Sequence, residues 1–456
     1  MAKTNTHHGM ISGITAAIRH ACHDMQTGTQ SMDDWPHPEV GTPAAKEMRA
    51  QQTFGRLLDV QPLAEQPSVA QLAELAASMA EGPDDETEGP AAAGSAFLGQ
   101  FIDHDLTLDA TTMLDMVSGD VTQIENFRTP RLDLDCVYGN GPEVDPWLYG
   151  HQGRTHALAF GTDVEGGPLA NPLDLTRNRN ARALIGDPRN DENLFVSQVH
   201  GRQFVARHNA LIEEDGDGAE GFERAAERLR HEYQHRVLDE FLPDVVAPEV
   251  LAPLMADARS GRLGGAIGWD RAPDMPVEFS AAAFRFGHSM IRHEYALNDR
   301  FGAEELFSEV NRGFSPVAPW HNLDLDRFFG PTAQRARPIN TKLVPDLIDL
   351  PVRVASNPAN LAERNMIRGQ RTFCLPSGEQ AAQALGFDVA DPHPEVERLG
   401  LTGNTPLWFY ILWEAELTGG KLGALGGTLV AGTILNLMLR DEGSILHVGA
   451  DHAVAA

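Results

Sequence analysis

The sequence predicts a mainly α-helical protein, built as a single large helical domain with long loops and an N-terminal extension. Apolar residues recur at helical spacing along most of the chain after residue 90. Few segments alternate apolar and polar residues as a half-buried strand would, and no internal repeat is visible. The predicted helices lie at 95–106, 195–213, 222–241, 279–293, 375–385, 406–417 and 428–440.

The first 90 residues are expected to form an extension that ends in a linker. A short helix is predicted over 69–80. Residues 81–90, which follow it, contain five acidic residues, no basic residue and two Gly-Pro pairs, a composition typical of a loop. We therefore divide the chain into an extension, 1–90, and a main domain, 91–456.

Composition narrows the classes of function. The chain has 456 residues, with 36 Lys and Arg against 65 Asp and Glu, and a formal net charge of −29. So acidic a surface repels phosphates and anionic lipid, which argues against a nucleic-acid-binding protein. The three cysteines, Cys22, Cys136 and Cys374, cannot build a disulfide framework and fit a reducing compartment.

Neither a secretory signal nor a membrane span is expected. The first residues lack the apolar stretch of a signal peptide. The expected location is therefore the cytoplasm, although export without such a signal would leave little trace in the sequence. The uncharged stretch 422–439 is interpreted as a buried helix that follows a Gly-rich turn.

The first candidate motif is Gly99-Gln-Phe-Ile-Asp-His-Asp105. Helical spacing places Gln100, Asp103 and His104 on one face, while Asp105 points about 100° away. The segment is otherwise apolar, so these side chains are expected to be buried, and buried polar groups need partners or a function. The alternative is a solvated polar face.

The second motif is an acidic loop that reads Thr129-Pro-Arg-Leu-Asp-Leu-Asp135. Oxygen-bearing side chains at alternate positions, with the backbone carbonyl of Arg131 between them, suit a hard cation such as Ca²⁺. Asp105 would add a third carboxylate to Asp133 and Asp135 if it faces this loop. The alternative is an ordinary acidic surface loop.

Two further motifs could line a pocket. In Gly186-Asp-Pro-Arg-Asn-Asp-Glu-Asn193, the side chains of Arg189 and Glu192 follow a turn that leads into a helix. In Ala283-Phe-Arg-Phe-Gly-His288, a histidine after glycine on an aromatic-rich helix can lie against a flat ligand. The alternatives are a helix cap for the first motif and a core histidine for the second.

A competing motif is the His231-Glu-Tyr-Gln-His235 sequence on a predicted helix. Its H-E-x-x-H spacing is typical of zinc hydrolases, in which His231 and His235 would bind zinc and Glu232 would be the general base. A third ligand would have to come from downstream, where Glu240 or Glu249 is available. The alternative is a charged helix face with i,i+4 pairs.

Taken in order, the first four motifs and Asn365-Met-Ile-Arg368 resemble the animal-type haem peroxidases, the superfamily of myeloperoxidase and cyclooxygenase, which includes bacterial members. The resemblance covers roughly residues 90–440. It implies that 91–456 form a helical haem peroxidase catalytic domain with haem b and Ca²⁺ as cofactors. Hydrogen peroxide and a small electron donor would be its substrates.

The resemblance also implies roles for individual residues. His104 would move a proton between the two peroxide oxygens, Arg189 would stabilise the departing oxygen, and Gln100 would line the distal pocket. His288 would bind the haem iron, with Asn365 as the partner of its other nitrogen. The propionate-binding arginines would be Arg285 and Arg368. Ester bonds to haem would come from Asp103 and Glu192. The calcium ligands would be Asp105, Thr129, Arg131 through its carbonyl, Asp133 and Asp135.

Departures from the family pattern bear on the redox chemistry and on the reaction that is expected. Asn193 stands where myeloperoxidase has the methionine of its sulfonium link. Fatty-acid dioxygenases of the superfamily use a tyrosine three residues before the proximal histidine, and Arg285 stands there in this chain. The expected reaction is therefore reduction of H₂O₂ with oxidation of a halide, thiocyanate or a small aromatic donor. A fatty-acid dioxygenase, the zinc hydrolase and a non-catalytic calcium-stabilised module are the alternatives.

Overall fold

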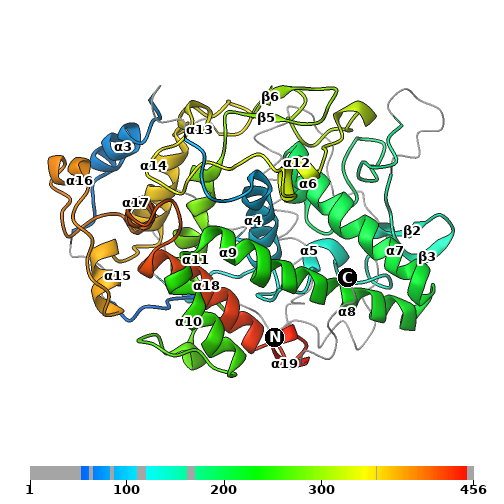
Figure 1. Ribbon diagram of the computed structural model, residues 1–456, viewed down its shortest axis with the longest axis horizontal. Helices are drawn as coiled ribbons and strands as arrows, with labels where there is room; N and C mark the ends of the chain where they lie inside the picture. The colour runs from blue at the N-terminus through cyan, green and yellow to red at the C-terminus, as the bar shows by residue number, and fades with distance from the viewer. Residues whose placement is uncertain are drawn as a thin grey trace, which may run out of the picture.

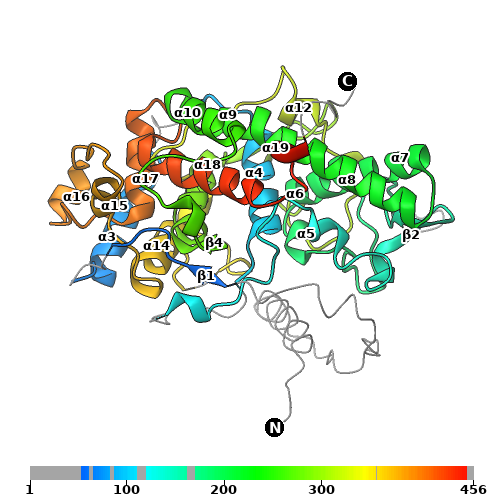
Figure 2. The ribbon, with the colours of Figure 1, turned by 90° about the horizontal axis from the view of Figure 1, so that it is seen from below.

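The computed structural model describes residues 53–60, 65–82, 87–109, 120–161, 170–355 and 357–448. Within these ranges the protein is mainly helical, as predicted, with three small two-stranded sheets (Figure 1). Helix α4 (Ala93–Leu106) lies near the middle of the molecule in both views (Figures 1 and 2). Helices α14 to α17 lie on one side of it, and α5, α7 and the β2–β3 hairpin lie on the other.

The remaining α-helices are short or of medium length. In the first half of the described chain they are α3 (Val69–Ser78), α5 (Asp135–Tyr138), α6 (Leu194–Gln198), α7 (Ala206–Asp215), α8 (Ala219–Arg236) and α9 (Leu242–Val245). In the second half they are α10 (Pro248–Arg259), α11 (Val277–Ala281), α12 (Asp326–Phe329), α13 (Pro345–Ile348), α14 (Leu361–Met366), α15 (Gly378–Ala384), α16 (Pro394–Arg398), α17 (Leu407–Leu417), α18 (Ala424–Leu439) and α19 (Ile445–Val448).

Three π-helical segments lengthen α-helices into longer rods, two by joining neighbouring helices and one by extending α14. The first two correspond to the predicted helices 195–213 and 222–241, and the third belongs to a helix that the sequence pattern did not predict. The segments are η5 (Val199–Val205) between α6 and α7, η6 (Val237–Phe241) between α8 and α9, and η10 (Ile367–Thr372) after α14.

The strands are short and lie at the edges of the helical body. The parallel pair is β1 (Phe54–Gly55) with β4 (Met275–Pro276). The antiparallel pairs are β2 (Tyr149–His151) with β3 (Arg154–Leu158), and β5 (Glu294–Ala296) with β6 (Ala303–Glu305). The 3₁₀ segments are η2 (Val121–Gln123), η3 (Pro146–Leu148), η4 (Pro188–Asp191), η7 (Trp269–Arg271), η8 (Ala283–Met290) and η9 (Pro319–His321).

The uncharged stretch 422–439 forms a buried helix, as predicted. This helix, α18, packs against α10 and α17. A side chain at Gly427 would collide with Val246 and Val250, so glycine lets the backbone approach its neighbours closely. In the part of the chain that the structure describes, no helix is long and apolar enough to cross a membrane.

Stacked aromatic rings fix the position of α4. Phe97 stacks on Phe195 of α6 with ring centroids 4.3 Å apart, and Phe101 stacks on Phe204 of η5 at 4.2 Å. All four rings are buried. Each pair adds about 1 kcal/mol to the effect of apolar burial. The helix that carries Gln100, Asp103 and His104 is therefore held firmly against the α6–η5–α7 rod.

The prediction of one helix over 279–293 is wrong in detail. The chain leaves the helical conformation at Ala282, so α11 ends at Ala281 and the tight 3₁₀ segment η8 follows. Phe279 and Phe284 stack with ring centroids 4.5 Å apart across this break. In a continuous α-helix, side chains five residues apart point about 140° from one another, so the break permits the stacking.

The described residues before the expected boundary belong to the same hydrophobic core as the rest. Leu72 and Leu75 of α3 are fully buried in it, and Phe54 of β1 joins it beside β4. The buried carboxylate of Glu278 accepts hydrogen bonds from the backbone N–H groups of Leu57 and Leu58, at 2.9 and 3.2 Å. The division at residue 90 stays a prediction about how the chain is organised.

We expect Glu278→Leu to lower the free energy of unfolding by about 2 kcal/mol, because two buried N–H groups lose their acceptor. Glu278→Gln keeps one acceptor oxygen and should cost about half as much. Urea unfolding of the two variants measures the difference. Equal losses would contradict the role of the carboxylate in fastening residues 57 and 58.

Candidate active site

The structure brings the predicted distal residues together. Gln100 and His104 lie one turn apart on α4 and both face Glu192, which follows η4. Gln100 Nε2 donates a hydrogen bond to Glu192, and His104 Nε2 lies 3.6 Å from Glu192 Oε1. Asp103, on the same helix, accepts a hydrogen bond of 2.9 Å from the hydroxyl of Thr107.

Arg189 closes the carboxyl end of α4. Its NH2 group donates hydrogen bonds to the backbone carbonyls of His104 and Thr107, at 3.1 and 2.7 Å. The same guanidinium pairs with the buried carboxylate of Asp187 at 2.7 Å. Arg189 therefore stays beside His104 without contacting its imidazole.

Asp187 is held ionised by two arginines. Burial alone would raise its pKa, but the charges of Arg128 and Arg189 bring the pKa well below its usual range. Arg128 lies 2.8 Å from the Asp187 carboxylate. The sequence pattern assigned no role to Asp187 or Arg128, because a buried ion pair between distant segments leaves no local pattern.

The helix-cap interpretation of the 186–193 motif is also correct. Asp187 accepts a hydrogen bond from the N–H of Arg189, and Asn193 accepts one of 2.9 Å from the N–H of Val196. Asn193 additionally donates to Gln100 Oε1 at 3.2 Å. The same turn thus caps the next helix and places Arg189 and Glu192 beside α4.

The predicted proximal pair is formed. His288 on η8 and Asn365 on α14 approach each other, with 2.8 Å between His288 Nδ1 and Asn365 Nδ2. Half a turn of the amide exchanges its oxygen and nitrogen, after which His288 Nδ1–H donates and its Nε2 lone pair is free. Burial and the charge of Arg285 lower the pKa of His288 to about 3, so the imidazole is neutral, as a metal ligand must be.

Two neighbouring arginines, Arg285 and Arg368, have too few acidic partners to neutralise both of their positive charges. Burial and the charge of Arg368 lower the pKa of Arg285 to about 10. Arg285 donates to the carbonyl of Ser280 at 3.0 Å, and Arg368 pairs with Asp109 at 2.8 Å. Arg368 Nε is buried without a hydrogen-bond partner among the described residues. These crowded cations fit an anionic ligand such as the carboxylates of a haem.

The distal and proximal groups influence one another electrostatically. The pKa of Arg285 also responds to Asp103 and Arg189, which belong to the distal set. Segment η8 packs directly against α4. Residues that are nearly two hundred positions apart in the sequence therefore belong to one site.

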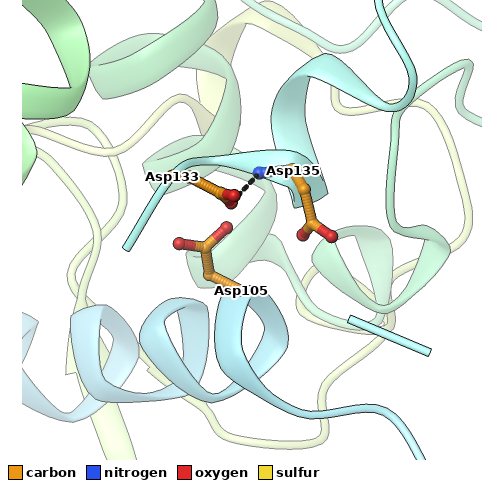
Figure 3. Close-up of side chains that lie close together, drawn as sticks. All are labelled: Asp105, Asp133 and Asp135. Carbon is orange, nitrogen blue, oxygen red and sulfur yellow. Dashed lines mark hydrogen bonds between the residues drawn. The ribbon is translucent and has the colours of Figure 1, made fainter. Parts of the chain in front are cut away.

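The predicted calcium ligands converge on the opposite side of α4. Figure 3 shows Asp105 pointing from α4 toward Asp133 and Asp135, and one oxygen of each carboxylate lies within 4.8 Å of the others. Burial raises the pKa of Asp105, and the negative charges of Asp133 and Asp135 raise it further. Three carboxylates so close together fit a hard divalent cation.

Thr129 lies beside this cluster, and the ligand role of the Arg131 backbone carbonyl stays a prediction. The Thr129 hydroxyl donates to Asp135 at 2.9 Å. The side chain of Arg131 is half exposed and lies 3.8 Å from Asp441, which leaves its backbone carbonyl as the only ligand it could offer. Arg128 NH1, which the sequence analysis missed, is 3.5 Å from Asp135.

The alternative zinc site is not formed. Glu232 pairs with Arg207 at 2.6 Å, His235 pairs with Asp239 at 3.2 Å, and His231 contacts the carbonyl of Gly443 at 3.0 Å. Across the described ranges, the one group of three or more converging metal-ligating side chains is the Asp105 cluster.

The comparison with protein families agrees with this geometry. The model of the animal haem peroxidase family matches residues 114–390, more than half of the chain, and the chain therefore belongs to this family. Membership implies a haem cofactor. The matched region begins after α4, so the roles of Gln100 and His104 depend on geometry rather than on this match.

A curated protein is similar to part of this chain. It is 29% identical over 196 residues to a peroxidase-like protein of Margaritifera margaritifera, a match that covers 39% of this chain and 23% of that protein. The chain thus spans about a quarter of that curated relative.

Two solved structures share the fold at low sequence identity. Peroxidase A of Dictyostelium discoideum has a TM-score of 0.58 at 15% identity, and the alignment covers 87% of this chain and 89% of that one. The fatty acid α-dioxygenase of Arabidopsis thaliana has a TM-score of 0.59 at 13% identity, and the alignment covers 97% of this chain and 82% of that one. The fold is therefore common to peroxidases and dioxygenases.

We expect calcium to stabilise the protein more at pH 8 than at pH 5. Without a cation, the folded-state pKa of Asp105 exceeds its unfolded value, so stability falls as the pH rises through the raised pKa. Bound calcium removes this loss and adds about 3 kcal/mol at a hundred times its dissociation constant. Melting curves in EGTA and in calcium chloride at the two pH values provide the test.

Asp105→Asn is the control, since it removes one negative charge and keeps an acceptor oxygen for Leu134 N–H. In EGTA this variant should melt no lower than the wild type, and calcium should raise its melting temperature far less. A calcium-dependent rise as large as that of the wild type would refute the assignment.

Proposed function

We propose that the protein is a haem-dependent peroxidase that reduces hydrogen peroxide and oxidises a small donor such as a halide, thiocyanate or an aromatic molecule. One observation carries the proposal: His104 and Arg189 lie next to each other in one electrostatically coupled site with the neutral imidazole of His288 and its partner Asn365. Calcium at the Asp105 cluster is part of the proposal.

The residues present fit a haem. His288 would hold the iron, and Arg285 and Arg368 would pair with the propionates. Asp103 and Glu192 are both partly accessible and are the candidates for ester bonds to the porphyrin. When bound, the haem supplies the iron chemistry that cleaves the peroxide O–O bond.

The chain's own residues would handle the proton and the charge. His104 Nε2 faces Glu192 and the accessible side of α4, where it can take a proton from one peroxide oxygen and return it to the leaving oxygen. Arg189, held by Asp187 and the end of α4, provides fixed positive charge near the developing negative charge. Gln100 and Glu192 orient the groups around this exchange.

The positions of the tyrosines favour a peroxidase over a fatty-acid dioxygenase. None of the five tyrosines is three residues before His288. Four of them have a hydrogen-bond partner: His208 for Tyr138, the carbonyl of Tyr138 for Tyr149, the N–H of Arg292 for Tyr295 and the N–H of Ala390 for Tyr410. The buried hydroxyl of Tyr233 has none among the described residues. The indole of buried Trp408, not a phenol, contacts the carbonyl of Arg285 at 3.1 Å.

The assay that separates the two activities uses the haem-loaded chain. We expect peroxide-dependent oxidation of iodide, bromide, thiocyanate or guaiacol, and no oxygen uptake with palmitate, because the tyrosine that dioxygenases need is missing. Oxygen consumption with palmitate at a rate above that of any donor would contradict the proposal.

We expect His104→Leu to slow the reaction of the haem-loaded protein with peroxide by roughly 10²- to 10⁴-fold, the contribution typical of a positioned general base. Stopped-flow absorbance of the Soret band measures this rate. His235→Leu is the matched control, because His235 is exposed and pairs only with Asp239. A His104→Leu rate equal to that of His235→Leu would remove His104 from the mechanism.

A further inference from the structure

Three buried side chains form a continuous hydrogen-bonded row behind the distal site. His104 Nδ1 lies 2.8 Å from Asn190 Oδ1, and Asn190 Nδ2 lies 3.1 Å from His200 Nδ1. The three side chains are 4%, 0% and 1% exposed, so water does not compete for these contacts. Asn190 lies within the 186–193 motif but was assigned no role there, and no motif in the sequence indicated His200.

His200 at the end of the row is neutral. Burial lowers its pKa to about 3. A neutral imidazole carries one N–H and one lone pair, so each of its nitrogens has a single role. Its Nε2 is buried without a hydrogen-bond partner among the described residues, so only Nδ1 contributes to the row.

The position of His200 is fixed by its surroundings. It lies in η5, the π-helical segment between α6 and α7, and π-helical turns often place functional side chains. Phe101 of α4 packs beside it, with ring centroids 6.1 Å apart, and Phe101 itself stacks on Phe204. The helix that carries His104 therefore also holds His200 in place.

The row links the orientation of the Asn190 amide to the proton position on His104. With Oδ1 toward His104, as the structure has it, His104 carries its proton on Nδ1 and presents a lone pair at Nε2. With the amide turned by half a turn, Nδ2 would donate to His104 Nδ1 and the proton would be on Nε2. Only the first arrangement leaves a base facing the site.

Glu192 favours the other tautomer of His104, in which the proton is on Nε2. Its carboxylate lies 3.6 Å from His104 Nε2 and would attract a proton to that nitrogen. Asn190 counters this. With its Nδ2 toward His200 Nδ1, as the structure has it, the amide N–H can only donate, so His200 Nδ1 accepts and Oδ1 stays directed toward His104. The balance between Glu192 on one side and Asn190 with His200 on the other sets the tautomer.

We propose that Asn190 and His200 are positioning residues that keep the proton of the distal histidine on Nδ1, so that His104 Nε2 is available as a base. The consequence for catalysis rests on the proposed peroxidase function. The tautomer itself is a property of the chain and is tested independently of that function.

The primary experiment is two-dimensional ¹H–¹⁵N NMR of the full chain labelled with ¹⁵N-histidine, which distinguishes Nδ1–H from Nε2–H tautomers. The chain is used haem-free or with its haem as the diamagnetic ferrous carbonyl complex. His104→Gln and His200→Phe assign the two signals. We expect Nδ1–H for His104 and Nε2–H for His200, and Nε2–H for wild-type His104 would overturn the proposal.

Variants add a second readout. Asn190→Leu and His200→Phe should shift His104 toward the Nε2–H tautomer and slow the reaction with peroxide roughly tenfold. His200→Asn restores an acceptor close to the position of Nδ1 and should recover the rate to within about twofold of the wild type. An unchanged tautomer in both disrupting variants would overturn the proposal. If they fail to fold, the wild-type tautomer alone decides.

The two proposals fail in distinguishable ways. A chain that shows the expected tautomers but does not react with peroxide would refute the peroxidase function and leave the positioning role of Asn190 intact. A chain that reacts with peroxide while His104 carries its proton on Nε2 would refute the positioning role and leave the function intact.

Discussion

The buried carboxylate of Asp187 is the group on which the geometry of the site depends. It is fully excluded from solvent, and an unpaired charge there would cost several kcal/mol. Arg128 and Arg189 compensate it from two directions. Arg128 extends this ion pair to Asp135 of the carboxylate cluster, and Arg189 extends it to the carbonyls at the end of α4. The candidate calcium site and the distal site are therefore linked by one chain of buried charges.

Helical periodicity was enough to predict α4 and the divergent directions of its polar side chains. Gln100 and His104 face one way and Asp105 faces another, as a rotation of 100° per residue requires. The break at Ala282 could not be predicted, because stacking of Phe279 on Phe284 overrides local helix propensity. Arg128 and Asn190 were assigned no role because their partners Asp187 and His104 are distant in sequence, and only the fold brings them together. His200 matters only through its contact with Asn190, so it was missed as well.

The family fold alone does not decide the reaction, since peroxidase A of Dictyostelium discoideum and a plant α-dioxygenase share it with this chain at similar TM-scores. The choice between the peroxidase and the dioxygenase reaction rests on individual residues. Under the proposed function, Arg285 stands where a dioxygenase would need a tyrosine. Burial and the charge of Arg368 lower the pKa of this guanidinium, and the charge of Asp103 raises it. Asn193 caps α6 and binds Gln100, which gives the position a structural role without a link to haem.

The central claim is that His288 and His104 belong to one haem site that reacts with peroxide. The most direct measurement is the absorption spectrum of the purified, haem-supplemented chain before and after one equivalent of H₂O₂, with metals counted on the same sample. We predict a Soret band that shifts on addition of peroxide, with about one iron and about one calcium per chain. A protein that binds no haem, or a Soret band that peroxide leaves unchanged, would contradict the account.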